Sequence, residues 1–268
     1  MLRRILPQFL LTTALALCLA LGVASCGNQP RVEETLVRAM DAANQGRFLE
    51  ASQLALECRR YAPELPDAWI LHSFATYMGA SRATAREQAV YDLNKATRSF
   101  PDRYDAWLFY GWALLESGES RDAIRPLEEA LKRVPQGSPH KGKIQMLLGK
   151  CYLQNNLQAQ ALTILQPLRV KEPYRSSPEL YNALGKLAIM RQNPQSAKNF
   201  FLEGLRFAPR DEVLLQNLAV TCDLYLKETK EAKKAYIQCL QVKQKGRQDP
   251  EGCQRITNRL RALTRRSN

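Results

Sequence analysis

The chain has 268 residues and a formal net charge of +13, because 39 Lys and Arg stand against 26 Asp and Glu. Its seven cysteines form no C-x-x-C pair, and its only histidines are His72 and His140. This donor set lacks the ligand spacing of a zinc site, so we expect no metal and no cofactor. The excess of positive charge bears on solubility and association rather than on fold.

The first 25 residues have the organisation of a secretory signal. Leu2-Arg3-Arg4 is a short positive start, and residues 5–24 are almost wholly apolar. Small residues then lead directly into Cys26. A charged start, a short apolar stretch and small residues before a cleavage point are typical of a secretory signal. The alternative is an ordinary membrane anchor, because about 20 apolar residues can cross a bilayer.

The run Val23-Ala24-Ser25-Cys26 resembles the lipobox of bacterial lipoproteins, in which an aliphatic residue and two small residues precede a cysteine. The resemblance implies that residues 1–25 are removed as a signal peptide and that Cys26 is acylated on its thiol and its new amino group. Residues 26–31 would form a short lipidated tether. In such lipoproteins an Asp after the cysteine usually retains the protein in the inner membrane. Gly27 stands there, so the resemblance implies the periplasmic face of the outer membrane.

The clearest of several similar units runs from residue 104 to residue 137. Its first half has aromatic and small residues at helical spacing, and Gly118 then breaks the helix. Its second half has apolar residues at helical spacing, and Pro135 ends it because proline cannot continue a helix. The residues that form this pattern are Trp107, Tyr110, Gly111, Leu114, Ala123, Leu127 and Ala130.

This pattern resembles the tetratricopeptide repeat, a helix–turn–helix unit of about 34 residues with W-x₂-L-G-x₂-Y, A-x₃-F and a closing proline. Further copies lie on both sides and end at Pro63, Pro101, Pro173 and Pro209, while the sixth has no closing proline. In the second copy the turn over residues 79–84 is longer than usual by about four residues.

We therefore predict an all-α fold, a solenoid of about six such repeats over residues 32–249. The family resemblance implies a right-handed superhelix. One repeat cannot bury its apolar face alone, so the repeats should stack into one continuous domain. Residues 250–268 should form a basic C-terminal capping helix, because one face is apolar and the other strongly charged.

In this family, partners usually bind along a concave face lined by the first helix of each repeat, at positions i, i+4 and i+7. The resemblance then implies a groove that is apolar at its N-terminal end and carries lysines and asparagines at its C-terminal end. Such a groove suits an extended peptide or a partner helix with acidic or backbone groups at one end. The residues predicted to bind a partner are Ile70, Phe74, Tyr77, Leu108, Trp112, Leu115, Met146, Lys150, Asn182, Lys186 and Asn217.

The alternative for the apolar members of this set is that neighbouring helices cover them. Apolar residues at helical spacing are more often core than binding site, so both possibilities stay open for Phe74, Trp112 and Leu115. Two interpretations are also open for a pair of cysteines. Cys222 and Cys239 lie on the two helices of the last copy and either pair in an oxidising compartment or remain free thiols.

No motif of nucleophilic, phosphate-binding or zinc-dependent catalysis occurs in the sequence, so we predict that the protein is not an enzyme. The favoured hypothesis is a lipid-anchored adaptor that binds an envelope protein or peptide. Similar architecture occurs in the pilotins that guide type IV pilus secretins, and in outer-membrane lipoproteins that scaffold peptidoglycan hydrolases.

The alternative hypothesis is a structural or glycan-binding lipoprotein. Residues 242–268 contain eight Lys and Arg against two acidic residues. Such a tail attracts anionic partners, here peptidoglycan or lipopolysaccharide. Because the resemblance implies the periplasm, we expect no nucleic-acid partner.

Overall fold

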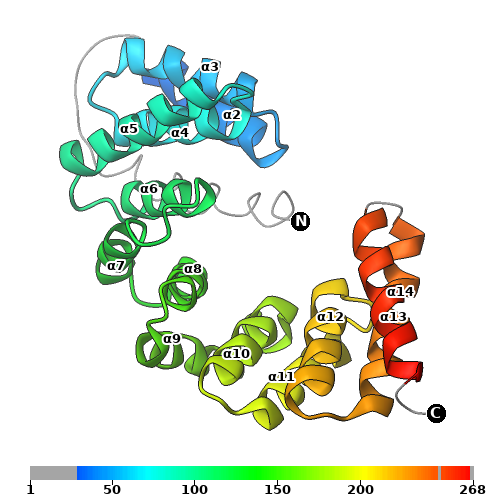
Figure 1. Cartoon of the computed structure of the whole chain (residues 1–268). Coiled ribbons are helices and arrows are strands. Elements are labelled where there is room, and N and C mark those ends of the chain that lie inside the picture. Colours follow the sequence, from blue (N-terminus) through cyan, green and yellow to red (C-terminus); the bar gives the residue numbers. More distant parts are fainter. Residues whose placement is uncertain (1–28, 247–248, 266–268) are drawn as a thin grey trace. The chain divides into compact units, whose positions relative to one another are not determined.

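The computed structural model describes residues 29–246 and 249–265, and within these ranges it is helical throughout, with no strand (Figure 1). The predicted signal peptide and Cys26 lie outside the described residues. The chain divides into two compact units, one ending at Ile144 and the other beginning at Gln145. The sequence predicted a single array over residues 32–249, and this division falls inside one helix of that array.

In the first unit, helices pair in the order of the sequence, and each helix packs against the one that follows it. The first helix of each repeat is α2, α4 or α6, and the second is α3, α5 or α7. Their bounds are α2 (Gln29–Asn44), α3 (Phe48–Tyr61), α4 (Pro66–Gly79), α5 (Ala83–Ser99), α6 (Tyr104–Glu116) and α7 (Ile124–Arg133), followed by the start of α8 (His140–Gln154).

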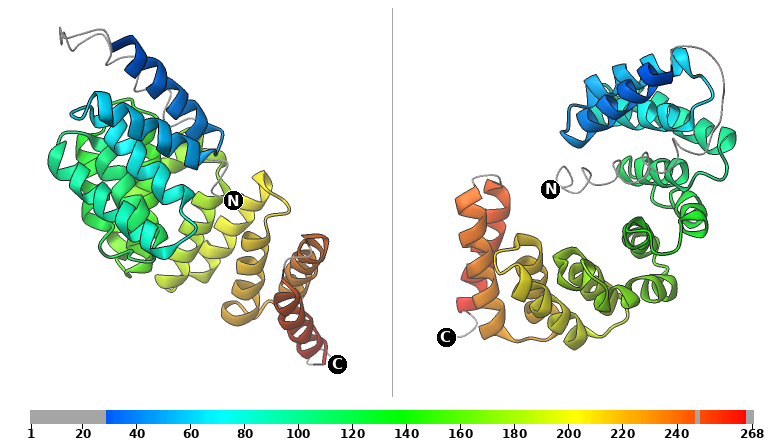
Figure 2. Two further views of the ribbon diagram at one scale, coloured as in Figure 1. Left: turned by 90° about the horizontal axis from the view of Figure 1, so that it is seen from above. Right: turned by 180° about the vertical axis from the view of Figure 1, so that it is seen from behind.

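The second unit continues the alternation and ends in an additional helix. That last helix, α14, packs side by side with α13, as both views of Figure 2 show. The remaining bounds are α9 (Gln158–Leu165), α10 (Pro178–Met190), α11 (Pro194–Phe207), α12 (Glu212–Val220), α13 (Thr229–Gly246) and α14 (Pro250–Arg265), with short helical turns η2 (Gln166–Val170), η3 (Tyr174–Ser176) and η4 (Thr221–Tyr225).

Glycines at one position of the first helix let the two helices of a repeat approach closely. A Cβ atom added to any of these glycines would lie 2.2 to 2.6 Å from a side-chain atom of the second helix. The facing residue is sixteen positions later in each case, so the contact repeats with the sequence pattern. The pairs are Gly111 with Leu127, Gly149 with Leu165 and Gly185 with Phe201.

The tryptophan and proline of the repeat pattern are joined by a hydrogen bond. The indole Nε1 of Trp69 donates to the carbonyl oxygen of Pro63 at 2.5 Å, and that of Trp107 donates to Pro101 at 2.8 Å. Each bond ties the start of a first helix to the turn that ends the preceding second helix. The proline positions predicted to close repeats therefore also fix the entry of the next repeat.

Two helices differ from the sequence prediction at their N-termini. Helix α5 begins at Ala83, so the extra residues of the second copy lengthen a helix rather than the turn over residues 79–84. Helix α2 begins at Gln29, three residues before the predicted start of the array. Pro30 lies in its first turn, where proline is tolerated because the N–H groups there have no partner within the helix.

Prolines inside the second helices also alter the repeat. Pro126 lies in the first turn of α7 and the helix begins only at Ile124. Pro167 follows the end of α9, and the chain continues as a 3₁₀ turn through Val170. A proline lacks the N–H that the helix ladder needs, which explains the short second helix of the fourth repeat.

The cysteines after residue 26 are free thiols, and all but Cys253 are buried. Cys222 and Cys239 therefore do not pair in this structure. Burial raises the pKa of Cys58 to about 11 and that of Cys151 to about 12. The four buried thiols pack as small apolar side chains.

Candidate partner-binding surface

The apolar residues predicted to bind a partner in the first unit lie in its core. None of the six exposes more than 6 % of its surface. Their burial favours the alternative that they pack between helices, because a covered side chain offers a partner no contact area. The residues are Ile70, Phe74, Tyr77, Leu108, Trp112 and Leu115.

Aromatic contacts between α4 and α6 account for this burial. The ring centroid of Phe74 lies 4.4 Å from that of Phe109 and 5.6 Å from that of Trp112. The Tyr77 ring lies 5.4 Å from Trp112, and its hydroxyl donates to the carbonyl oxygen of Ala113 at 3.1 Å. The spacing of these residues in the sequence puts them on one helix face, and in the structure that face joins two first helices to each other.

A small cavity of about 20 Å³ lies beside this stripe, between α2, α4 and α6. Ile70 and Phe109 are among its lining residues, together with Asp67 and Asp105. A water molecule needs roughly 10–15 Å³, so this space has room for a water but not for a side chain of a partner.

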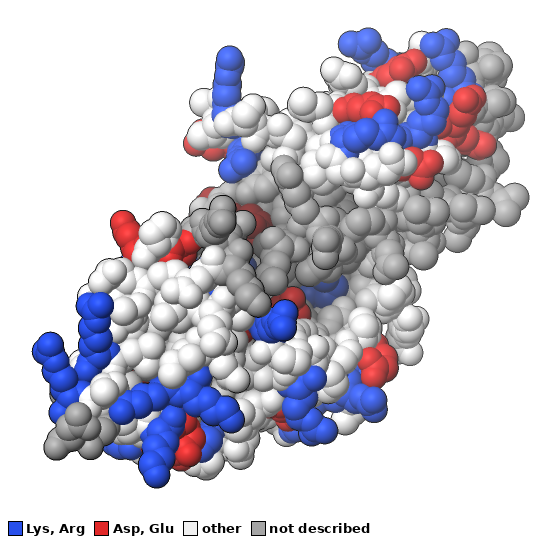
Figure 3. All heavy atoms as spheres, turned by 90° about the vertical axis from the view of Figure 1, so that its right-hand side faces the viewer, with Lys and Arg blue, Asp and Glu red and all other residues white. Residues whose placement is uncertain are grey.

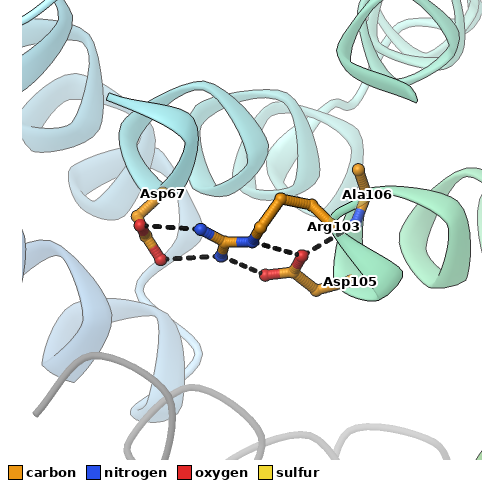
Figure 4. Close-up of polar contacts among 4 residues, drawn as sticks. All are labelled: Asp67, Arg103, Asp105 and Ala106. Atoms are coloured by element: carbon orange, nitrogen blue, oxygen red, sulfur yellow. Dashed lines mark hydrogen bonds and ion pairs between the residues drawn. The ribbon is translucent and has the colours of Figure 1, made fainter. Parts of the chain in front are cut away.

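Asp67 and Asp105 belong to an ion cluster that the sequence analysis missed (Figure 4). Arg103 donates from Nη1 and Nη2 to the Asp67 carboxylate at 3.0 and 2.9 Å. It also donates from Nε and Nη2 to the Asp105 carboxylate at 3.0 and 2.6 Å. The guanidinium thus bridges the N-termini of α4 and α6. The sequence Asp-Ala-Trp, present at residues 67–69 and again at 105–107, is the signal that indicates this cluster.

The neighbours of Arg103 stabilise its charged form. Burial alone would lower its pKa, but the hydrogen bonds to Asp67 and Asp105 outweigh burial and raise it. All three side chains expose less than a fifth of their surface. The cluster therefore stabilises the junction between two repeats and leaves no free cation there for a partner.

In the second unit, the predicted polar residues keep exposed surface. We call Lys150, Asn182, Lys186 and Asn217 the polar row. They lie on the first helices α8, α10 and α12. Helix α10 contacts α12, and α8 packs against the apolar cluster that includes Leu180 of α10. Both lysines are exposed and both asparagines are half-buried. Met146, the remaining predicted residue, is half-buried and packs against the cluster that contains Leu180 and Leu184.

The two asparagines are joined directly. Asn217 donates from Nδ2 to Oδ1 of Asn182 at 2.6 Å. The bond uses one polar atom of each amide and leaves Asn182 Nδ2 as a donor and Asn217 Oδ1 as an acceptor. Among the described residues no ion pair engages Lys186. The row therefore offers a donor, an acceptor and a cation on adjacent helices.

The basic C-terminal helix is fastened by ion pairs. Arg259 on α14 binds the buried Asp223 with contacts of 2.6 and 2.7 Å. The hydrogen bond from Arg259 lowers the pKa of the Asp223 carboxyl. Lys243, itself buried, contacts Glu212 at 2.5 Å and Asp249 at 2.7 Å.

These ion pairs neutralise part of the positive charge on which the glycan-binding hypothesis depends. Arg255 also lies 3.6 Å from Glu251 on the exposed side of α14. On the face drawn in Figure 3, acidic side chains lie among the lysines and arginines. Mixed charge of this kind gives a weaker field than a uniform basic stripe.

Two further features bear on the class of protein. Across residues 29–246 and 249–265, no group of three or more His, Cys, Asp or Glu side chains gathers closely enough to hold a metal ion. In the same part of the chain, no helix combines the length and the apolar character needed to span a bilayer.

Comparison with known proteins identifies the repeat. A tetratricopeptide-repeat family model matches residues 82–138 and 111–174. No curated protein sequence gives a significant match.

Solved structures with the same fold share little sequence with this chain. PilW, described as a widely conserved type IV pilus biogenesis factor, has a TM-score of 0.70 at 14% identity, over 86% of this chain and all of PilW. PilF of Pseudomonas aeruginosa has a TM-score of 0.68 at 16% identity, over 87% of this chain and all of PilF. YrrB, described as a TPR protein with an unusual peptide-binding site, has a TM-score of 0.58 at 15% identity, over 76% of this chain and 97% of YrrB. Together with the paired helices and the family match over residues 82–174, these likenesses show that the chain has the tetratricopeptide-repeat fold.

Proposed function

We propose that this chain is a lipid-anchored adaptor on the periplasmic face of the outer membrane, and that its polar row binds a protein or peptide partner during assembly of an envelope complex. The observation that carries the proposal is the set of polar groups presented by α8, α10 and α12. Repeat proteins of this kind generally act as interaction scaffolds, which agrees with an adaptor role.

The chemistry of the row suits an extended segment of a partner. Asn182 Nδ2 can donate to a peptide carbonyl, and Asn217 Oδ1 can accept from a peptide N–H. Lys186 supplies a mobile positive charge for an acidic side chain of the same segment. A partner with an acidic residue next to an extended stretch therefore fits the row.

The kind of complex that we propose rests on the structural likeness to PilW and on the N-terminal sequence. PilW is described as a type IV pilus biogenesis factor, and its fold covers most of this chain. The run Val23-Ala24-Ser25-Cys26 resembles a lipobox. Two or more acyl chains hold a protein stably at a bilayer, so a lipidated Cys26 would concentrate the partner at the membrane. Pilus secretin assembly is the favoured setting, and regulation of a cell-wall hydrolase is the other.

Co-purification from solubilised envelopes tests partner binding. The double variant Lys150→Glu/Lys186→Glu should lose the partner, because two charges facing an acidic segment are reversed. Its control is Lys171→Glu/Lys230→Glu, which reverses two exposed lysines elsewhere in the same unit. Equal recovery of the partner with both double variants would contradict the proposal.

Fractionation of a Cys26→Ala variant tests the anchor. The variant should leave the membrane fraction once its signal is cleaved, or should remain uncleaved. A cleaved variant that stays in the membrane fraction would show that the lipobox interpretation is wrong. Partner binding by the polar row is measured separately and could survive that result.

A further inference from the structure

An open pocket in the second unit lies between α9, η2, α10 and α11, and no residue of the polar row lines it. Its volume of about 280 Å³ is near the lower limit of small-molecule sites, so it has room for one large side chain and a small polar group. Its walls are mainly apolar. The apolar lining residues are Leu162, Leu184, Leu187, Ala188 and Phe200.

Two arginines also line this pocket. Arg191 follows the last turn of α10, is exposed, and has no ion pair among the described residues. Arg169 lies in η2, and its guanidinium carbon is 5.3 Å from the centre of the Phe200 ring. Arg169 also pairs with an acidic residue, since its Nη2 lies 3.4 Å from the Glu203 carboxylate.

The hydrogen-bonding capacity of Arg169 is incompletely used. Its Nε is buried and has no hydrogen-bond partner, although the side chain keeps 37% of its surface exposed. A buried donor without a partner is unfavourable, and a planar guanidinium matches a carboxylate through two parallel bonds. The Arg169 guanidinium therefore has unused hydrogen-bonding capacity beside the pocket.

The N-terminus of α11 adds to the positive character of the same rim. Asn193 and Ser196 both line the pocket, and Asn193 Oδ1 accepts from the Ser196 backbone N–H at 3.0 Å. This cap satisfies one N–H group and leaves the amide Nδ2 of Asn193 as a donor. Two arginines and a helix N-terminus thus surround an apolar depression.

We propose that this pocket binds the C-terminal residue of a partner chain that ends in a large apolar side chain, such as leucine or phenylalanine. The side chain enters between Leu184, Leu187 and Phe200. The terminal carboxylate binds Arg169 and Arg191. The ligand class is therefore an apolar group and an anion held close together in one molecule.

A chain terminus fits this arrangement better than an internal acidic residue does. At a C-terminus the apolar side chain and the carboxylate share one Cα atom, so both reach a small pocket at once. An internal Asp or Glu carries its carboxylate on its own side chain, and the apolar group must come from another residue. The pocket is also too small for an extended cofactor.

A fluorescent octapeptide of glycine and serine that ends in leucine is the probe. Its binding to the full chain is measured by fluorescence anisotropy, alongside the same peptide with a C-terminal amide. The free acid should bind saturably, and the amide at least tenfold more weakly. A third peptide, with an internal glutamate before a leucine amide, should bind as weakly as the amide.

Single substitutions assign the carboxylate contacts. Arg191→Gln and Arg169→Gln should each weaken the free acid at least fivefold and leave the amide unchanged. Arg206→Gln removes an exposed arginine elsewhere on α11 and is the matched control. Arg191 is exposed, so its variant should keep native helicity even if Arg169→Gln loosens the packing on Phe200.

Several outcomes would overturn the proposal. Free-acid binding that is no tighter than that of the amide or the glutamate peptide, or that does not saturate, would contradict it. So would a loss of free-acid binding in Arg206→Gln as large as that in Arg169→Gln and Arg191→Gln. The proposal does not rest on the polar row, so the Lys150→Glu/Lys186→Glu variant should bind the octapeptide as the wild type does.

Discussion

Replacing Arg103 with glutamine should loosen the first unit at the junction of α4 and α6. The substitution removes the guanidinium that holds two carboxylates, and it leaves Asp67 and Asp105 unpaired in a site that is mostly covered. Their side chains expose 19% and 14% of their surface. Exposed ion pairs contribute about 0–1 kcal/mol, whereas removing one partner of a buried pair costs about 3–5 kcal/mol.

We expect about 3 kcal/mol for Arg103→Gln, the lower end of the buried range, because water still reaches the edge of the cluster. That free energy corresponds to a local opening that is roughly 150-fold more frequent. Arg31→Gln is the control, since Arg31 and Glu57 are 60% and 37% exposed at 3.3 Å. For this exposed pair we expect less than about 1 kcal/mol.

Hydrogen exchange followed by mass spectrometry measures this opening helix by helix, which matters because repeat arrays need not unfold in one step. Peptides from α4 and α6 should exchange roughly 150-fold faster in Arg103→Gln, and peptides from α10 to α12 should be unchanged. If Arg103→Gln accelerates exchange no more than Arg31→Gln does, the cluster does not stabilise the junction. A variant that also carries Asp67→Asn and Asp105→Asn should recover most of the loss.

Two other changes test the second unit. Gly185→Ala places a Cβ 2.2 Å from the buried ring of Phe201, so it should lower the free energy of unfolding by about 1–3 kcal/mol, measured by urea denaturation. Adding Phe201→Leu should restore part of that loss. Acid should release α14, because the pKa of Asp223 is lowered by its bond to Arg259. The stability from this pair is present above the ordinary carboxyl pKa of about 3.9 and is lost as the pH falls through the lower folded value. Arg259→Gln removes the interaction that lowers this pKa, so hydrogen exchange of α14 should be faster than in the wild type already at neutral pH and should increase less on acidification. A pH dependence equal to that of the wild type would contradict this.

The parts of the fold that the sequence predicted are those set by local chemistry. Gly118 has φ +90 and breaks the chain between α6 and α7, and Pro135 follows the end of α7. Gly111 belongs to the repeat pattern, and only a small residue fits where its helix meets Leu127 of the next helix. These features depend on one repeat at a time, so the repeat pattern carries them.

Features that depend on contact between repeats were not predictable in the same way. The positions of Phe74 and Trp112 have the same helical spacing whether they face a groove or a neighbouring helix, and only the packing of α4 on α6 distinguishes the two. Arg103 lies outside the repeat pattern, and its two carboxylates are 36 residues and two residues away. The hydrogen bond between Asn182 and Asn217 depends on the register of α10 against α12, which spacing alone does not define.

Partner binding at the polar row is tested most directly by photo-crosslinking in living cells. A benzoylphenylalanine residue is placed at position 186, on the exposed side of α10, and in a second strain at position 230, on α13. We predict a discrete adduct with one envelope protein from position 186 and none from position 230. The same adducts at both positions, or no adduct at position 186 in cells that assemble the complex, would contradict the proposed role of the row.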